Sequence, residues 1–275
     1  MSYPLTIIRI LLVSLPLHGI YAESSPNVVF KNGRRIPASA LTLEGEKFVV
    51  KTAFEGFKVG QSIPATMAGH IHGDKPTEIN EAIALSLAGK FKKAQVMLLP
   101  IVNDYRITAK IPGNFWLDAA RTLLVAYAAN GDTADTATLG KEISDATSAQ
   151  GIDPFVALGK ALLINPVSDD REIALAALSN DDLPAELRAY ASFFRGNAFL
   201  KAKKNTEALE AYLAVPCLHP SGGLILNAAA ELQAADLLAA LGRREEAVAL
   251  LESALRVSTG TVLADEARSR LASLK

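Results

Sequence analysis

The chain has 275 residues, of which half are hydrophobic and only 6% are aromatic. The net charge of −1 gives no electrostatic reason to expect nucleic acid or an anionic membrane surface as a partner. Much of the apolar content is alanine, the best helix former, so the composition predicts a mainly helical protein. Cys217 is the only cysteine, which excludes an intrachain disulfide, and we expect its side chain to be buried.

The first 22 residues have the features of a secretory signal. Arg9 supplies positive charge, residues 10–17 are apolar, and Ala22 is a small residue before Glu23. We therefore expect export to the periplasm or cell envelope, with cleavage after Ala22. Retention as an N-terminal anchor is the alternative, although an uninterrupted membrane span needs about 20 apolar residues.

Residues 23–74 are expected to form a small strand-rich module. Residues 28–30 and 34–36 flank Asn32-Gly33, a strong hairpin signal because both turn positions tolerate a positive φ. A second hairpin is centred on residues 44–46. The other expected strands are 41–43, 47–51, 63–67 and 70–72. Since so small a module buries little core, we expect it to pack on the first helices.

The last predicted strand carries two histidines. His70 and His72 share one face of a strand, and Asp74 follows two residues later. Two imidazoles and a carboxylate can bind zinc or iron. No nearby His or Cys completes the set, so the other interpretation is two surface histidines, and we assign neither a metal nor another cofactor.

From residue 75 to residue 275 the pattern is helical. The predicted helices are 77–88, 91–103, 114–130, 133–148, 153–164, 169–179, 184–202, 205–214, 222–242, 244–257 and 261–274. A short unit recurs along them, with a small residue, a turn glycine, an alanine in the next helix and a bulky residue after it. One copy contains Gly196, Phe199, Ala208 and Tyr212, and another contains Gly242, Ala247 and Leu251.

These copies resemble the tetratricopeptide repeat. The resemblance implies a solenoid of about five α-α hairpins over residues 75–275. The order of an export signal, the module with Asn32 to Ile36, and helices opened by Ile111 to Trp116 is also similar to exported repeat proteins of the verrucomicrobial type. That similarity implies a bacterial envelope compartment.

The motif survey predicts a non-enzymatic protein. No phosphate-binding loop or nucleophile elbow is present. Cys217 and His219 are the only nucleophile and base close in sequence, and they lie in a predicted loop. A hydrolase with an unrecognised site is the remaining enzymatic interpretation. We expect Trp116, the only tryptophan, to pack where the helical region starts, and a ligand platform is its alternative role.

The expected function is to bind a protein or peptide as an envelope scaffold. Helical-hairpin arrays present a concave groove lined by the first helix of each pair. Aligning the copies places five side chains along this groove: Arg121, Asn197, Lys201, Gln233 and Asp236. Ordinary solvated side chains are the other interpretation of these five. A membrane-associated complex is one setting for such a partner. The alternative function is metal or small-ligand binding by the strand module around His70, His72 and Asp74.

Overall fold

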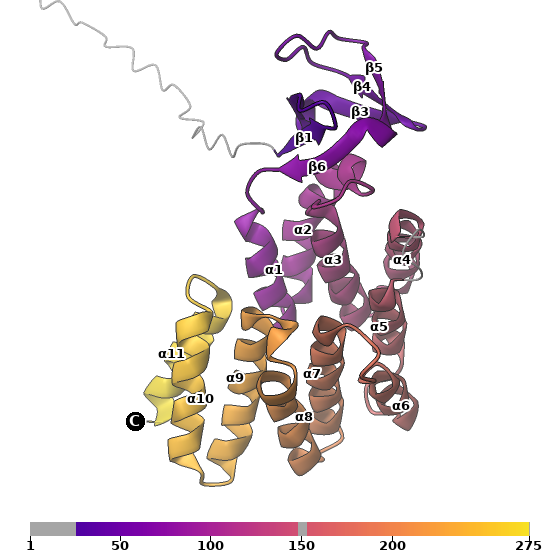
Figure 1. Cartoon of the computed structure of the whole chain (residues 1–275). Coiled ribbons are helices and arrows are strands. Elements are labelled where there is room, and N and C mark those ends of the chain that lie inside the picture. The colour runs from indigo at the N-terminus through magenta and orange to yellow at the C-terminus, as the bar shows by residue number, and fades with distance from the viewer. Residues whose placement is uncertain (1–25, 148–152, 275) are drawn as a thin grey trace, which may run out of the picture.

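The structure is a computed structural model that describes residues 26–147 and 153–274. The expected signal at 1–22, with its cleavage point after Ala22, lies outside the described residues. Within them, eleven α-helices follow a small module of antiparallel strands (Figure 1). The predicted class, mainly helical with an N-terminal strand module, is confirmed.

The strand module consists of two three-stranded antiparallel sheets. Their orders are β2-β1-β6 and β3-β4-β5. The strands are β1 Asn27–Phe30, β2 Arg35–Pro37, β3 Leu41–Glu44, β4 Lys47–Val50, β5 Ser62–Pro64 and β6 Ala68–His72. Both predicted hairpins form, and their turns contain Gly33 at φ +80° and Gly45 at φ +60°.

The strand module is joined to the helical region through a shared core. Its buried side chains, among them Phe48 and Leu41, pack with Ile111 from the segment before the third helix. The backbone N–H of Ile71 on β6 also donates to the carbonyl oxygen of Pro112 at 3.1 Å. The expected packing of the module on the first helices is therefore confirmed (Figure 1).

The helical region follows the predicted order. The helices are α1 Thr77–Leu87, α2 Phe91–Tyr105, α3 Trp116–Asn130, α4 Thr133–Thr147, α5 Pro154–Leu163, α6 Asp169–Ala177, α7 Ala185–Lys201, α8 Asn205–Leu218, α9 Leu224–Ala240, α10 Arg244–Val257 and α11 Val262–Leu274. Consecutive helices pack in pairs, as in α7 with α8 and α9 with α10. Gly196 allows one such pair to approach closely, because a Cβ there would lie 2.5 Å from the Tyr212 ring.

The end of α8 differs from the prediction. The helix continues through Pro216 to Leu218, where we expected it to end at residue 214. Proline is tolerated there because it lies in the last turn, where one lost backbone hydrogen bond disrupts little of the helix. The expected burial of Cys217 is wrong, since its side chain is exposed. The core face of α8 runs through Tyr212 and Val215, and a residue two positions later points away from it.

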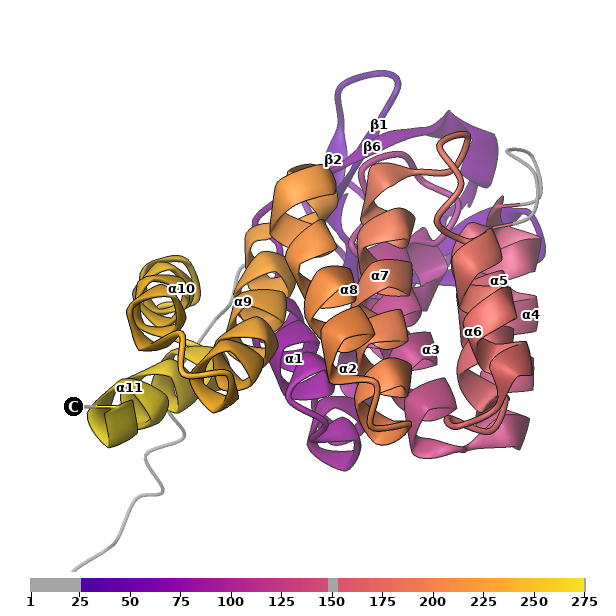
Figure 2. The ribbon, with the colours of Figure 1, turned by 90° about the horizontal axis from the view of Figure 1, so that it is seen from below.

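The two ends of the helical array meet. The first helix, α1, packs against both α9 and α11, as Figure 2 shows from below. Two contacts fasten this junction: the Val262 backbone N–H donates to Glu81 Oε2 at 3.2 Å, and Lys90 Nζ donates to Glu266 Oε1 at 2.8 Å. In an open solenoid each repeat contacts only its neighbours. The array here is instead closed on itself around one apolar core.

Candidate binding site

Two of the five predicted groove residues are already held in ion pairs. The Arg121 guanidinium lies 2.6 Å from a carboxylate oxygen of Asp153. Asp153 also caps α5 by accepting from the backbone N–H of Phe155 at 3.0 Å, so Arg121 holds α5 against α3. Asp236 on α9 pairs with Arg270 on α11 at 2.9 Å. Both side chains therefore hold the fold together.

The other three predicted residues come together. Asn197 and Lys201 on α7 and Gln233 on α9 line one hollow of about 350 Å³, which we call the inner hollow. It lies where α1, α3 and α7 end. Its remaining lining residues are Leu87, Ala88, Gly89, Phe91, Ala129, Pro166, Arg171, Phe194, Ala198 and Leu200. Three of the five aligned positions therefore line the same hollow.

Arg171 is the residue of the inner hollow that the sequence analysis missed. It is only 6% exposed. Its Nη1 donates to the carbonyl oxygens of Leu162 and Ile164, at 3.0 and 3.1 Å, where α5 ends. Its Nε has no hydrogen-bond partner, and no carboxylate in the described part of the chain forms an ion pair with it. Burial lowers the pKa of this guanidinium, but arginine remains a cation.

No acidic residue lines the inner hollow, and each of its polar side chains has N–H groups that can donate. Its charged side chains are Arg171 and Lys201. The Tyr212 hydroxyl donates to Asn197 Oδ1 at 2.7 Å, and burial raises the pKa of this tyrosine, so the hydroxyl keeps its proton. With its oxygen engaged, Asn197 has its amide N–H groups left to donate. The hollow is consequently suited to an acceptor that carries negative charge.

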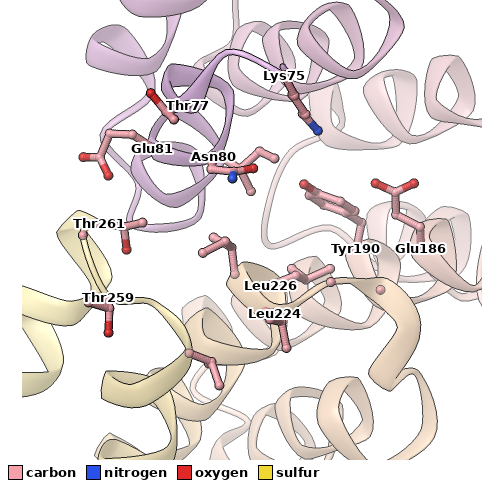
Figure 3. Close-up of a pocket in the computed structure, with 16 residues that line it drawn as sticks. Lys75, Thr77, Asn80, Glu81, Glu186, Tyr190, Leu224, Leu226, Thr259 and Thr261 are labelled. Carbon is pink, nitrogen blue, oxygen red and sulfur yellow. The ribbon is translucent and has the colours of Figure 1, made fainter. Parts of the chain in front are cut away.

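A larger cavity of about 630 Å³ lies where α1, α7, α9 and α11 begin. Figure 3 shows Lys75, Tyr190 and Glu186 on one side of it and Glu81 and Thr261 on the other. Desolvation raises the pKa of Glu186, although its side chain reaches solvent.

The charged groups of the larger cavity are mostly engaged within the protein. Lys75 pairs with Asp118 at 2.7 Å, and Glu81 accepts from the backbone of Val262 at 3.2 Å. Helix N-termini favour anions, whereas the two carboxylates in the lining oppose them. These opposing charges define no single ligand class, so the inner hollow is the better candidate.

The two histidines of the strand module lie on the exposed face of β6. His70 and His72 point outward on either side of the buried Ile71. In the described part of the chain, no group of three His, Cys, Asp or Glu residues is arranged to hold a metal ion. Asp74 therefore adds no third ligand to the pair.

Trp116, Cys217 and His219, also singled out from the sequence, lie outside both cavities. Trp116 is 1% exposed and packs at the start of α3, which excludes a surface platform. Cys217 lies in the last turn of α8 and not in the expected loop, while His219 follows that turn and is 9% exposed. Burial lowers the pKa of His219.

No protein-family model, no curated protein and no solved structure matches this chain. The helices within the described ranges are all too short or too polar to cross a membrane. The geometry of the inner hollow is therefore the basis for the functional argument.

Proposed function

We propose that this chain is an exported, non-enzymatic scaffold of the bacterial cell envelope that holds a short segment of a protein or peptide partner in the inner hollow. The helical domain in this proposal is a tetratricopeptide-like array of about five hairpins whose ends have closed together. The observation that carries the proposal is the convergence of Asn197, Lys201 and Gln233 with the buried Arg171.

The size of the hollow restricts what it holds. Ligand pockets in proteins have volumes of roughly 300–1,000 Å³. A hollow of about 350 Å³ accommodates a few residues of a partner and is too small for a whole helix. Contact between α1 and α9 also leaves less room for a long peptide along the first helices than an open solenoid has. The proposed partner therefore inserts a short segment or a chain end.

The test combines affinity capture with cross-linking. The chain is captured from the native cell envelope, and a variant with a photoreactive amino acid at position 233 is cross-linked in parallel. The same stoichiometric partner should co-purify and cross-link, and an Asn197→Ala/Lys201→Ala double variant should lose it at least tenfold. Lys141→Ala, at an exposed lysine of α4, is the matched control and should keep the partner.

Two outcomes would contradict the proposal. A partner that stays bound to the double variant and does not cross-link at position 233 would bind elsewhere. Protein that captures no partner but contains stoichiometric metal, lost on His70→Ala/His72→Ala substitution, would instead support the strand module as the functional part.

A further inference from the structure

The inner hollow contains a buried positive charge that the described protein does not neutralise. Arg171 contacts only the carbonyl oxygens of Leu162 and Ile164, which are neutral acceptors. Its neighbour in sequence, Glu172, pairs with Arg195 at 2.7 Å instead. A buried guanidinium without a counterion is costly to fold, because it loses hydration without gaining an opposite charge. Such a group is expected where a ligand supplies that charge.

One nitrogen of the guanidinium is left for a ligand. Nη1 is occupied by the carbonyl oxygens at the end of α5, and Nε has no partner but is closed off from the hollow by the protein around it. Nη2 makes no hydrogen bond to a described residue. Its N–H groups can donate a charge-assisted hydrogen bond to a carboxylate oxygen.

The other lining residues of the inner hollow favour a ligand that has a negative charge and an apolar part. Lys201 adds a second cation, and no acidic residue lines the hollow. The last turns of α1, α3 and α7 lie at its wall and oppose an anion, whereas the first turns of α2 and α6, which supply Phe91 and Arg171, favour one. Apolar side chains cover the remaining wall, namely Leu87, Phe91, Pro166, Phe194 and Leu200.

We infer that the inner hollow binds a single carboxylate carried on a compact apolar body, with Nη2 of Arg171 as its main contact. This inference rests on the proposed function in placing the ligand in that hollow. The carboxylate belongs either to a free organic acid or to an inserted partner segment, and the experiment separates these two sources.

The experiment uses the purified chain with ¹⁵N-labelled arginine. The probes are N-acetyl-leucine, N-acetyl-phenylalanine and N-acetylated tripeptides ending in Leu or Phe, each as the free acid and as the C-terminal amide. The Nε–H resonance of Arg171, assigned with Arg171→Lys, should shift with free acids and stay in place with amides. By calorimetry, free acids should bind at least tenfold more tightly than amides.

Two variants support the measurement. Arg171→Lys keeps the charge but removes the Nη2 donor, so binding of free acids should fall at least tenfold. Arg171→Lys also removes the contacts to α5 and can destabilise the fold. Lys201→Gln is therefore included as a substitution at an exposed position. It should weaken binding of the same acids several-fold and leave the protein folded. Tripeptide acids that bind much more tightly than the single acids would indicate a partner segment, and equal affinities would indicate a free organic acid.

The inference is wrong if acids and amides bind equally, if no acid shifts the Arg171 resonance at millimolar concentration, or if inorganic phosphate shifts it and the acids do not. These results are distinct from failure of the proposed function. If acids bind at Arg171 but no partner is captured, the carboxylate site is supported and the scaffold function is not. If a partner is captured through Lys201 but acids and amides displace it equally well, the scaffold function is supported and the carboxylate site is not.

Discussion

At the scale of single residues, Glu231 on α9 is a buried acid outside the candidate site. It is 8% exposed, and its Oε1 accepts from the Ser253 hydroxyl at 3.0 Å, while Oε2 has no partner. Desolvation raises the pKa of this carboxyl, and the Ser253 hydrogen bond and the charge of Arg256 offset only part of that rise. Ionised Glu231 therefore costs stability where α9 packs on α10.

We predict that Glu231→Gln stabilises the protein at pH 7.5 and not at pH 4. The folded pKa lies above the unfolded value of 4.5, so the folded state prefers the protonated acid. The destabilisation is absent below the unfolded pKa and develops as the pH rises through the folded pKa. Glutamine resembles the protonated acid at every pH. Calorimetry at pH 7.5 should show the melting temperature rising by about 2–4 °C for each kcal/mol gained.

Glu252→Gln is the control, because Glu252 is an exposed glutamate on the neighbouring helix α10. It should change the melting temperature by less than about 1 °C, as expected for surface substitutions. If Glu231→Gln raised the melting temperature equally at both pH values, the cause would be packing. That result would contradict the role of ionisation.

The residues of the candidate site could be predicted only in part. Asn197, Lys201 and Gln233 follow from helical spacing, since residues on one helix face lie together. Arg171 could not be recognised, because a cation in the first turn of a helix resembles a surface residue. Its burial depends on where α5 ends in space. The ion pair of Arg121 could not be predicted for the same reason, since its partner Asp153 lies 32 residues away.

At the scale of helices and strands, the predictions succeeded where local chemistry sets the boundary. The Ser168 hydroxyl caps α6 by accepting from the Asp170 backbone N–H at 3.1 Å. Gly131, at φ +84°, ends α3 in the left-handed conformation that glycine adopts easily. These signals lie within a few residues of the boundary and can be read from the sequence alone.

The start of α11, predicted to within one residue, is also held by a distant residue. Glu81 on α1 accepts from the Val262 backbone N–H at 3.2 Å and places a carboxylate at the N-terminus of α11. We predict that Glu81→Ala destabilises the protein by about 0.5–2 kcal/mol, the usual range for loss of an N-terminal cap. Hydrogen exchange of amides in the first turn of α11 should accelerate in this variant.

Glu81→Gln separates the hydrogen bond from the charge. It keeps an acceptor oxygen and loses the carboxylate charge, so its stability and exchange should lie between those of the wild type and Glu81→Ala. Unchanged exchange at the start of α11 in Glu81→Ala would show that this contact does not hold the helix start.

At the scale of the whole molecule, a chain of charges closes the array. Lys90 before α2 pairs with Glu266 on α11 at 2.8 Å, and Arg270 lies between Glu266 and Asp236, at 3.5 and 2.9 Å. The repeat pattern predicts contacts between neighbouring hairpins only. Whether the first and last helices meet depends on small rotations added over every repeat, and no local signal in the sequence records their sum.

If the array is closed, a substitution in α11 should lower the local stability of α1. Glu266→Lys places a third positive charge beside Lys90 and Arg270, so it should loosen the junction and accelerate hydrogen exchange in α1, which lies far away in sequence. Exchange in α4, which lies on the other side of the array in Figure 2, should not change. Glu252→Lys is the control, since it makes the same change of charge at an exposed position of α10.

The two architectures give opposite results in this experiment. In an open solenoid, stability is approximately a sum of terms from each repeat and its neighbours, so a change in the last helix would leave α1 unaffected. In the closed array, α1 loses part of its own packing when α11 moves, because both belong to one apolar core. Faster exchange in α1 for Glu266→Lys but not for Glu252→Lys would therefore establish closure in solution. If hydrogen exchange became faster only in α10 and α11, the two ends of the array would be separate in solution. The first helices would then line an open groove.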